Sequence, residues 1–170
     1  MRIMLDKVYT SYFYQIRFFK PNMIPLSTAV WDPKWYHAFK DQDTVFIDKN
    51  GVLNGCRFEA MHPDNTCADL CRGPETCQTG DPAQCQFLIN YWKQLDSLNF
   101  NLVIKNLETY LLDIQKILNF EELAIPVFIV HEAPDNPCSE RIVIQRWFNE
   151  NGVCCKELPY PLSQNYDKIF

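Results

Sequence analysis

The chain of 170 residues lacks several features that mark whole classes of protein. Its longest apolar candidate, residues 125–130, is far shorter than the roughly 20 residues of a membrane span. The first residues carry no apolar stretch with a small-residue cleavage site, so no secretory signal is expected. No block of Lys or Arg occurs and the net charge is −5, which disfavours bulk nucleic-acid binding. We therefore expect a cytoplasmic protein without a membrane partner.

The chain is rich in the residues that build a core. Apolar residues make up 47% and aromatic residues 14%, well above the range of disordered chains. The length fits one domain, and neither an internal repeat nor a low-complexity tract divides it. Eight cysteines are also present. In a reducing compartment thiols stay reduced, and clustered thiols tend to bind metal.

Several segments have the composition of strands. Residues 8–13 are rich in β-branched and aromatic side chains, which suit a pleated, partly buried strand. Residues 125–130 form a continuous apolar run, which is typical of a parallel strand buried on both faces. Asn50-Gly51 between apolar runs predicts a hairpin. The expected strands span residues 8–13, 24–30, 44–48, 52–60, 125–130 and 153–158.

Helical periodicity separates these strands. Apolar positions at helical spacing follow Ala83, and Asp81-Pro82 resembles a cap with a first-turn proline. The expected helices span residues 34–39, about 83–95, 99–118 and about 138–150. Strands separated by helices predict a single α/β domain over residues 1–170, with mainly parallel core strands flanked by helices. A cysteine-rich loop at 62–85 and a C-terminal arm at 159–170 complete this interpretation.

Four cysteines lie in or beside that loop with the spacing Cys67-x3-Cys71-x5-Cys77-x7-Cys85. The loop has few apolar residues, so burial alone cannot give it a fixed shape. A tetrahedral zinc site of four thiolates would, because metal binding then supplies local folding energy. An iron–sulfur cluster and free thiols remain alternatives, and His62 is a further candidate ligand. A closed four-cysteine zinc site would be structural, since no coordination position is left for water.

The segment after Val130 is the predicted ligand site, because open α/β sheets bind ligands at the carboxyl ends of their strands. His131 and Glu132 follow the strand directly, and Cys138 and Arg141 lie where the next helix begins. Arg141 is unfavourable for the dipole of its own helix, whereas an anion bound there would pair with it. The helix terminus would also favour the thiolate of Cys138. The alternative is an ordinary ion pair of Arg141 with Glu132 or Glu140 beside an inert Cys138.

A second group of side chains is a candidate for completing this site. Exposed aromatic rings beside a lysine can stack on a base while the lysine contacts a phosphate. Aromatic clusters are more often core, which is the competing interpretation. The candidates are Ser11 and Tyr12 of the first strand, with Tyr9, and Lys34 and Trp35 after the second, with Trp31.

Both ends of the chain resemble the domain of unknown function 488 family. The phrase Glu132-x5-Cys138-x2-Arg141, followed by residues 147–153, is similar to the family's Glu, its Cys-His-Arg triplet and a helix ending in Asn-Glu-x-Gly. Residues 9–13, 25–27 and 33–35 resemble the family's first half. This chain lacks the triplet's histidine and has one extra position there. The resemblance implies a cytosolic α/β fold with a cysteine-rich loop peculiar to a subgroup, and it supplies no reaction.

Three functions compete at this point. The first is a site for an anionic or nucleotide-like ligand, where Glu132 acts as acid or base, Arg141 stabilises negative charge and Cys138 is a nucleophile. The second is a non-catalytic, zinc-braced module whose loop contacts a protein or nucleic acid. The third is a redox sensor that uses the cysteines directly.

Overall fold

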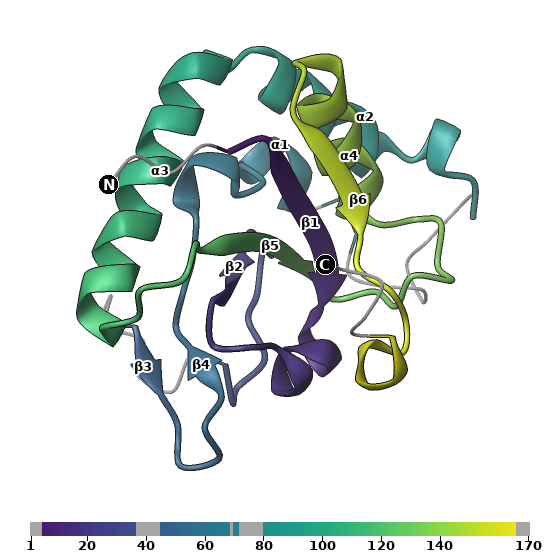
Figure 1. The fold of residues 1–170 in the computed structure, drawn as a ribbon. Helices are drawn as coiled ribbons and strands as arrows, with labels where there is room; N and C mark the ends of the chain where they lie inside the picture. Colours follow the sequence, from purple (N-terminus) through teal and green to yellow (C-terminus); the bar gives the residue numbers. More distant parts are fainter. Residues whose placement is uncertain (1–4, 37–44, 69, 72–79, 166–170) are drawn as a thin grey trace.

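A computed structural model, which describes residues 5–36, 45–68, 70–71 and 80–165, contains a parallel sheet of four strands (Figure 1). The strands are β1 (Lys7–Tyr12), β2 (Met23–Ser27), β5 (Ile125–Val130) and β6 (Cys154–Glu157). Their order is β2-β5-β1-β6, and every neighbouring pair is parallel. The predicted α/β class with mainly parallel core strands is therefore confirmed.

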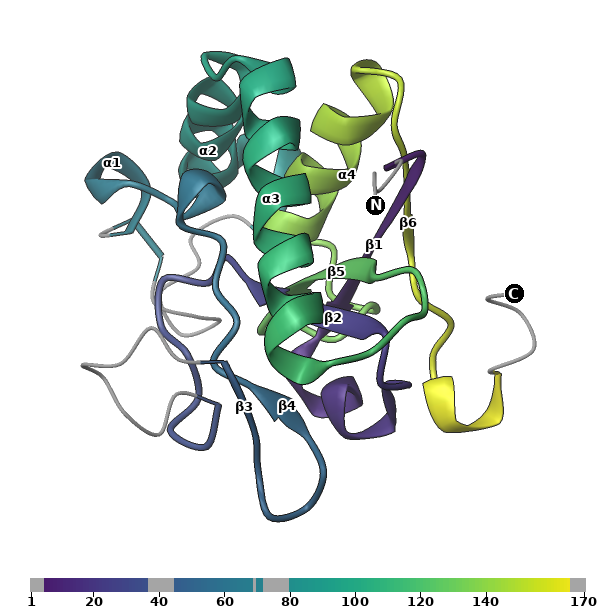
Figure 2. The same cartoon turned by 60° about the vertical axis from the view of Figure 1, so that its left-hand side comes forward.

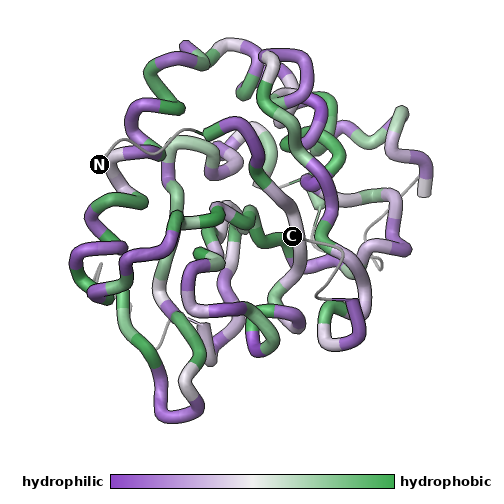
Figure 3. Tube along the Cα trace, viewed as in Figure 1, coloured by the Kyte–Doolittle hydropathy of each residue, from purple (hydrophilic) through white to green (hydrophobic). Residues whose placement is uncertain are grey.

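Strand β5 lies inside the sheet because its side chains are apolar on both faces. Val127 and Ile129 pack into one core, and Phe128 and Val130 pack into the other. All four side chains are fully buried. The hydropathy of the tube in Figure 3 shows the same contrast, since the centre of the sheet is hydrophobic and the tip of the β3–β4 hairpin is hydrophilic.

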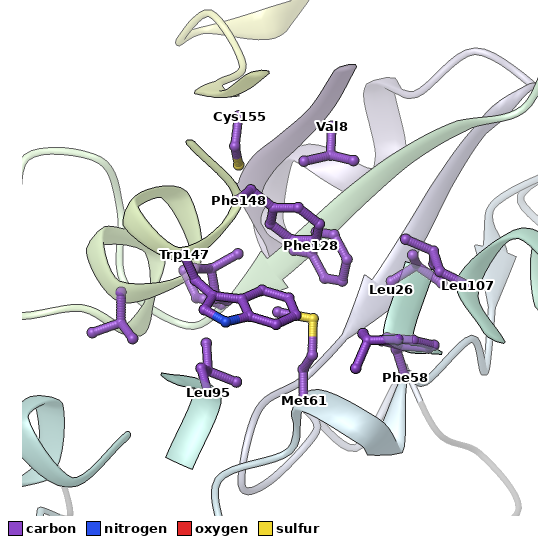
Figure 4. Close-up of a cluster of buried hydrophobic side chains, with 14 of the residues drawn as sticks. Val8, Leu26, Phe58, Met61, Leu95, Leu107, Phe128, Trp147, Phe148 and Cys155 are labelled. Atoms are coloured by element: carbon purple, nitrogen blue, oxygen red, sulfur yellow. The ribbon is translucent and has the colours of Figure 1, made fainter. Parts of the chain in front are cut away.

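Three helices cover one face of this sheet (Figure 2). They are α2 (Gln86–Asp96), α3 (Phe100–Leu118) and α4 (Glu140–Glu150), all near their predicted positions. Figure 4 shows Trp147 and Phe148 of α4 meeting Phe128 of β5 and Met61 in the shared core. Fully burying one such large apolar side chain stabilises the fold by about 1.5–3 kcal/mol.

Short elements cover the other face of the sheet. Here η1 (Phe13–Phe18) and η5 (Leu162–Gln164) pack with Tyr36 against Val127 and Ile129. Leu162 is fully buried, and its backbone N–H donates to Gln15 Oε1 over 2.7 Å. The first part of the expected C-terminal arm is therefore packed onto the sheet, because Leu162 supplies apolar cover that η1 alone does not.

In its described part, the segment between β2 and α2 contains the hairpin and three short helical elements. Strands β3 (Phe46–Ile47) and β4 (Leu53–Asn54) pair antiparallel around Gly51, which adopts a φ of 78°, as the Asn-Gly signal predicted. They are followed by η2 (Glu59–Met61), α1 (Asn65–Ala68) and η4 (Pro82–Gln84). Asp81 caps η4 by accepting from the N–H of Ala83.

Some predicted boundaries differ from the structure. The second strand ends at Ser27 rather than at residue 30, because the Ser27 hydroxyl donates to Asp32 over 2.5 Å and closes a turn. Strand β4 stops at Asn54, before Gly55 with its φ of 83°. Residues 34–36 form a turn, and the rest of the short helix expected at 34–39 lies outside the described residues. In the described part of the chain, no helix has both the length and the apolar character needed to cross a bilayer.

Candidate functional site

A pocket of about 1020 Å³ lies at the carboxyl ends of β2 and β5, beside the first turns of α2 and α4. We call it the strand-end pocket. Its described walls come from segments distant in sequence, because the parallel strands bring the chain that follows each of them to one edge. The described lining residues are Val30, Trp31, Cys71, Gly80, Cys85, Phe87, Leu88, His131, Glu132, Asn136, Pro137, Cys138 and Glu140.

Glu140 is a strongly perturbed acidic group of the pocket. It is the first residue of α4, after the cap Ser139, and its buried Oε2 has no hydrogen-bond partner among the residues that the structure describes. Burial raises the pKa of the Glu140 carboxyl to about 8, and the negative charge of Glu132 adds to that rise. Glu140 is therefore mainly protonated at neutral pH, so it can donate a proton or a hydrogen bond.

Glu132 is held in place by residues at the start of α4. The Ser139 hydroxyl donates to Glu132 Oε2 over 3.0 Å, and Arg141 Nη2 donates to the backbone carbonyl of Glu132. Ser139 also accepts from the N–H of Arg141, which caps the helix. Two hydrogen bonds therefore join the segment after β5 to the N-cap and first turn of α4 at the pocket.

Arg141 is buried, with 4% of its surface exposed, and it does not line the pocket. Its Nε lies 3.2 Å from Glu157 Oε2 at the end of β6, so the guanidinium forms an ion pair there. The sequence suggested an ordinary ion pair of Arg141 with Glu132 or Glu140. The observed partner is Glu157, which is distant from Arg141 in the sequence. Burial lowers the pKa of Arg141 and raises that of Glu157. One ionised partner offsets only part of the free energy that it costs to remove each charged group from water.

The structure separates the other predicted ligand-binding residues from this pocket. Ser11 is fully buried and accepts from Gln15 over 2.9 Å, while Tyr12 packs on the opposite face of the sheet with the helices. Lys34 is exposed, and Trp35 packs edge to face against Phe13. None of these four residues is among those that line the pocket. Adjacent residues of one strand point to opposite faces, so Ser11 and Tyr12 do not meet one ligand.

The predicted metal ligands are placed in part. Cys67 is fully buried in the core below α2, whereas Cys71 and Cys85 are partly buried and line the strand-end pocket. Burial raises the pKa of the Cys67 thiol. Cys77 lies outside the described residues. Among the residues that the structure describes, no three His, Cys, Asp or Glu side chains form a group able to hold a metal ion.

Trp31 and His131 close the pocket at the strand ends. His131 Nε2 hydrogen-bonds to the backbone carbonyl of Trp31, which ties the end of β5 to the segment after β2. The Trp31 side chain is 64% exposed, so its ring is available to a ligand. Cys138 lies on the same side, where its N–H donates to Asn136 Oδ1 over 3.0 Å.

Sequence reasoning found Glu132 and Cys138 but treated Glu140 only as an ion-pair partner. The only sequence signal at Glu140 is that an acidic residue follows a capping serine. Acidic residues are common in the first turn of a helix, so this signal does not single out Glu140. Thr28 and Tyr91 were also missed as polar neighbours. The buried Thr28 hydroxyl lies beside Tyr91, whose pKa is raised by burial first and then by the Glu140 charge, while a hydrogen bond with Thr28 acts in the lowering direction.

No protein-family model, curated protein or solved structure matches this chain. The resemblance to the domain of unknown function 488 family therefore stays a prediction. Function has to be argued from the pocket itself.

Proposed function

We propose that this protein binds a small organic molecule in the strand-end pocket and that Glu140 and Glu132 supply acid–base groups to it. The observation that carries the proposal is the buried Glu140 Oε2, which finds no hydrogen-bond partner in the described part of the chain and lies on a residue that lines a cavity of about 1020 Å³. Leaving a buried polar atom unpaired costs about 1–3 kcal/mol. A bound molecule that hydrogen-bonds Glu140 would recover that energy.

The place and lining of the pocket support the same proposal. Ligands of open α/β sheets bind at the carboxyl ends of the strands, where this pocket lies. Small-molecule sites combine apolar walls with a few convergent polar groups. Phe87, Leu88 and Trp31 provide such walls, and Glu132, Glu140 and Cys138 provide the polar groups.

Acid–base chemistry is supported by the different surroundings of the two carboxyl groups. Glu140 is kept mainly protonated by burial, whereas Glu132 accepts a hydrogen bond from Ser139. Paired carboxyl groups with different environments are a common source of a general acid and a general base. Cys138 adds a thiol to the same pocket as a candidate nucleophile.

The anionic or nucleotide-like ligand expected from sequence has less support. The described lining holds two carboxyl groups and no Lys or Arg. Arg141, the cation expected to bind an anion, is engaged with Glu157 and with the carbonyl of Glu132. A phosphate in this pocket would face Glu132 and Glu140 without a described counter-charge.

Three probes with the same ring and different head groups test the proposal: benzylamine, benzyl alcohol and benzyl phosphate. Each is titrated into ¹⁵N-labelled protein, and amide shifts are followed by NMR. We expect at least one probe to shift the amides of residues 131–132 and 138–141 in a saturable way. The exposed side of α3, around Leu102 and Ile117, serves as the internal control surface. If none of the probes perturbs the pocket amides, the proposed function is rejected.

A further inference from the structure

The polar end of the strand-end pocket has the electrostatic character of a cation site. Glu132 and Glu140 face it, and neither Lys nor Arg occurs among the described lining residues. His131 also lines the pocket, and its Nε2 hydrogen-bonds to the backbone carbonyl of Trp31. Ligand selection should follow this charge, because desolvated like charges repel strongly.

Glu140 is the group that an incoming cation would contact. Glu140 lines the pocket, and within the described part of the chain its buried Oε2 has no hydrogen-bond partner, so it is an unused acceptor for a donor that enters beside it. A charge-assisted hydrogen bond is stronger than a neutral one, and a second carboxyl group, Glu132, is close enough to influence Glu140. Among the described residues, the other titratable groups that line the pocket are His131 and the thiols of Cys71, Cys85 and Cys138. The phenol of Tyr91 also interacts with the charge of Glu140. The Tyr91 hydroxyl donates a hydrogen bond to the backbone carbonyl of Met61 over 2.5 Å.

The rest of the pocket suits an aromatic or aliphatic body attached to that cation. Val30, Phe87 and Leu88 line it with apolar surface, and the exposed ring of Trp31 lies at its edge. A tryptophan face attracts ammonium and amidinium groups as well as aromatic rings. A metal ion, by contrast, would need at least three grouped ligands, and the described residues offer no such group.

We infer that the strand-end pocket selects an organic cation, a protonated amine or amidine on an apolar body, which displaces the proton of Glu140. The inference rests on the proposed function and names its ligand class. In the binding step the Glu140 carboxylic acid and the ammonium form a carboxylate–ammonium pair, and the acid's proton passes to the buffer. No bond other than the O–H bond of Glu140 is broken.

Proton displacement gives binding a characteristic pH dependence. Below the pKa of Glu140, each unit rise in pH should raise the affinity about ten-fold, because the ionised carboxylate becomes ten times more populated. The dependence should level off as the pH passes about 8, where Glu140 is already ionised. A ligand without positive charge should bind with the opposite trend or with none.

The test is an NMR titration of benzylamine, benzyl alcohol and benzyl phosphate at pH 6, 7 and 8, read at the pocket amides. We expect benzylamine to bind most tightly and its affinity to rise about ten-fold from pH 6 to pH 7. Glu140→Gln should remove this rise and weaken benzylamine binding at pH 8 at least ten-fold. Glu150→Gln, which changes an exposed carboxylate of the same helix, should match the wild-type protein.

The outcomes separate the inference from the proposed function. Tighter binding of benzyl alcohol or benzyl phosphate at the pocket, or benzylamine binding that is independent of pH, overturns the cation inference and leaves the pocket as a ligand site. Absence of pocket shifts with all three probes overturns both. The pH series on the wild-type protein decides the question even if Glu140→Gln fails to fold.

Discussion

At the scale of the single residue, Glu140 should set part of the pH dependence of stability. Its carboxyl has a pKa of about 8 in the folded chain against an ordinary value of 4.5. The folded state therefore holds a proton that the unfolded state loses between these values, and stability falls as the pH rises through that window. We expect Glu140→Gln, which cannot ionise, to be about 1–3 kcal/mol more stable than the wild-type protein at pH 8 and similar near pH 4. Urea unfolding at several pH values measures this difference.

Glu150→Gln is the matched control for that series. Glu150 belongs to the same helix but is exposed and pairs with Arg146 over 2.9 Å at the surface. Such surface pairs contribute at most about 1 kcal/mol, so this variant should follow the wild-type curve. Parallel curves for wild type and Glu140→Gln would show that Glu140 titrates normally and would remove the basis for its role as an acid.

Arg141 and Glu157 allow a second residue-scale prediction. Replacing Arg141 with Met should destabilise the protein by up to about 3–5 kcal/mol, because the partly buried Glu157 carboxylate loses its ionic partner. Adding Glu157→Gln to that variant should recover part of the loss, since the stranded charge is then gone. A double-mutant cycle in chemical denaturation measures the coupling. Additive losses would contradict the ion pair as a unit.

Residues next to a strand end were predictable from sequence, and residues placed by packing were not. Glu132 and Cys138 were found because they follow a recognisable buried strand. The burial of Glu140 depends on contacts between α2 and α4, which no local pattern specifies. Ser11 was grouped with Tyr12 although strand alternation sends them to opposite faces.

At the scale of the element, α3 depends on its N-terminal cap. Asn99 Oδ1 accepts from the N–H of Leu102 over 3.1 Å at the start of this 19-residue helix. Asn99→Ala should reduce the free energy of unfolding by about 1 kcal/mol because that N–H loses its partner. Asn101→Ala, an exposed substitution within the first turn, should be neutral or slightly stabilising since Ala is the better helix former. Equal effects of the two substitutions would show that the cap does not contribute.

Elements with strong periodicity were predicted well, and short irregular ones were missed. Helix α3 and strand β5 agree with their expected spans because their apolar patterns continue over the whole element. The 3-10 helix η1, which connects β1 to β2, contains six residues, too few to show a helical stripe. The end of β2 is set by a side-chain bond from Ser27 to Asp32 rather than by propensity.

At the scale of the whole molecule, strand order was outside the reach of the sequence patterns. A parallel sheet was expected from alternating strands and helices, but the order β2-β5-β1-β6 depends on contacts between distant segments. The same long-range packing brings Leu162 of the tail under the sheet and places Cys71 and Cys85 in one pocket. Topology therefore decided which of the predicted residues came together.

The four-cysteine metal site predicted from sequence is tested at the scale of the whole molecule, because metal binding at such a site would be coupled to folding of the segment that contains it. If Cys67, Cys71, Cys77 and Cys85 hold zinc, the purified protein should contain about one equivalent of zinc per chain and show no visible absorption. An iron–sulfur cluster would instead colour the sample. Cys67 packs in the core with Leu88 and Tyr91, so chelation of the metal should loosen the cysteine-rich loop and lower the midpoint of thermal unfolding. The far-ultraviolet circular dichroism of the sheet and helices should persist. Elemental analysis before and after chelation measures the bound metal. The same analysis is made on Cys85→Ser and on Cys154→Ser, which is the control outside the cluster. Metal-free protein with unchanged stability in both variants would reject the cluster and leave Cys71 and Cys85 as thiols of the strand-end pocket.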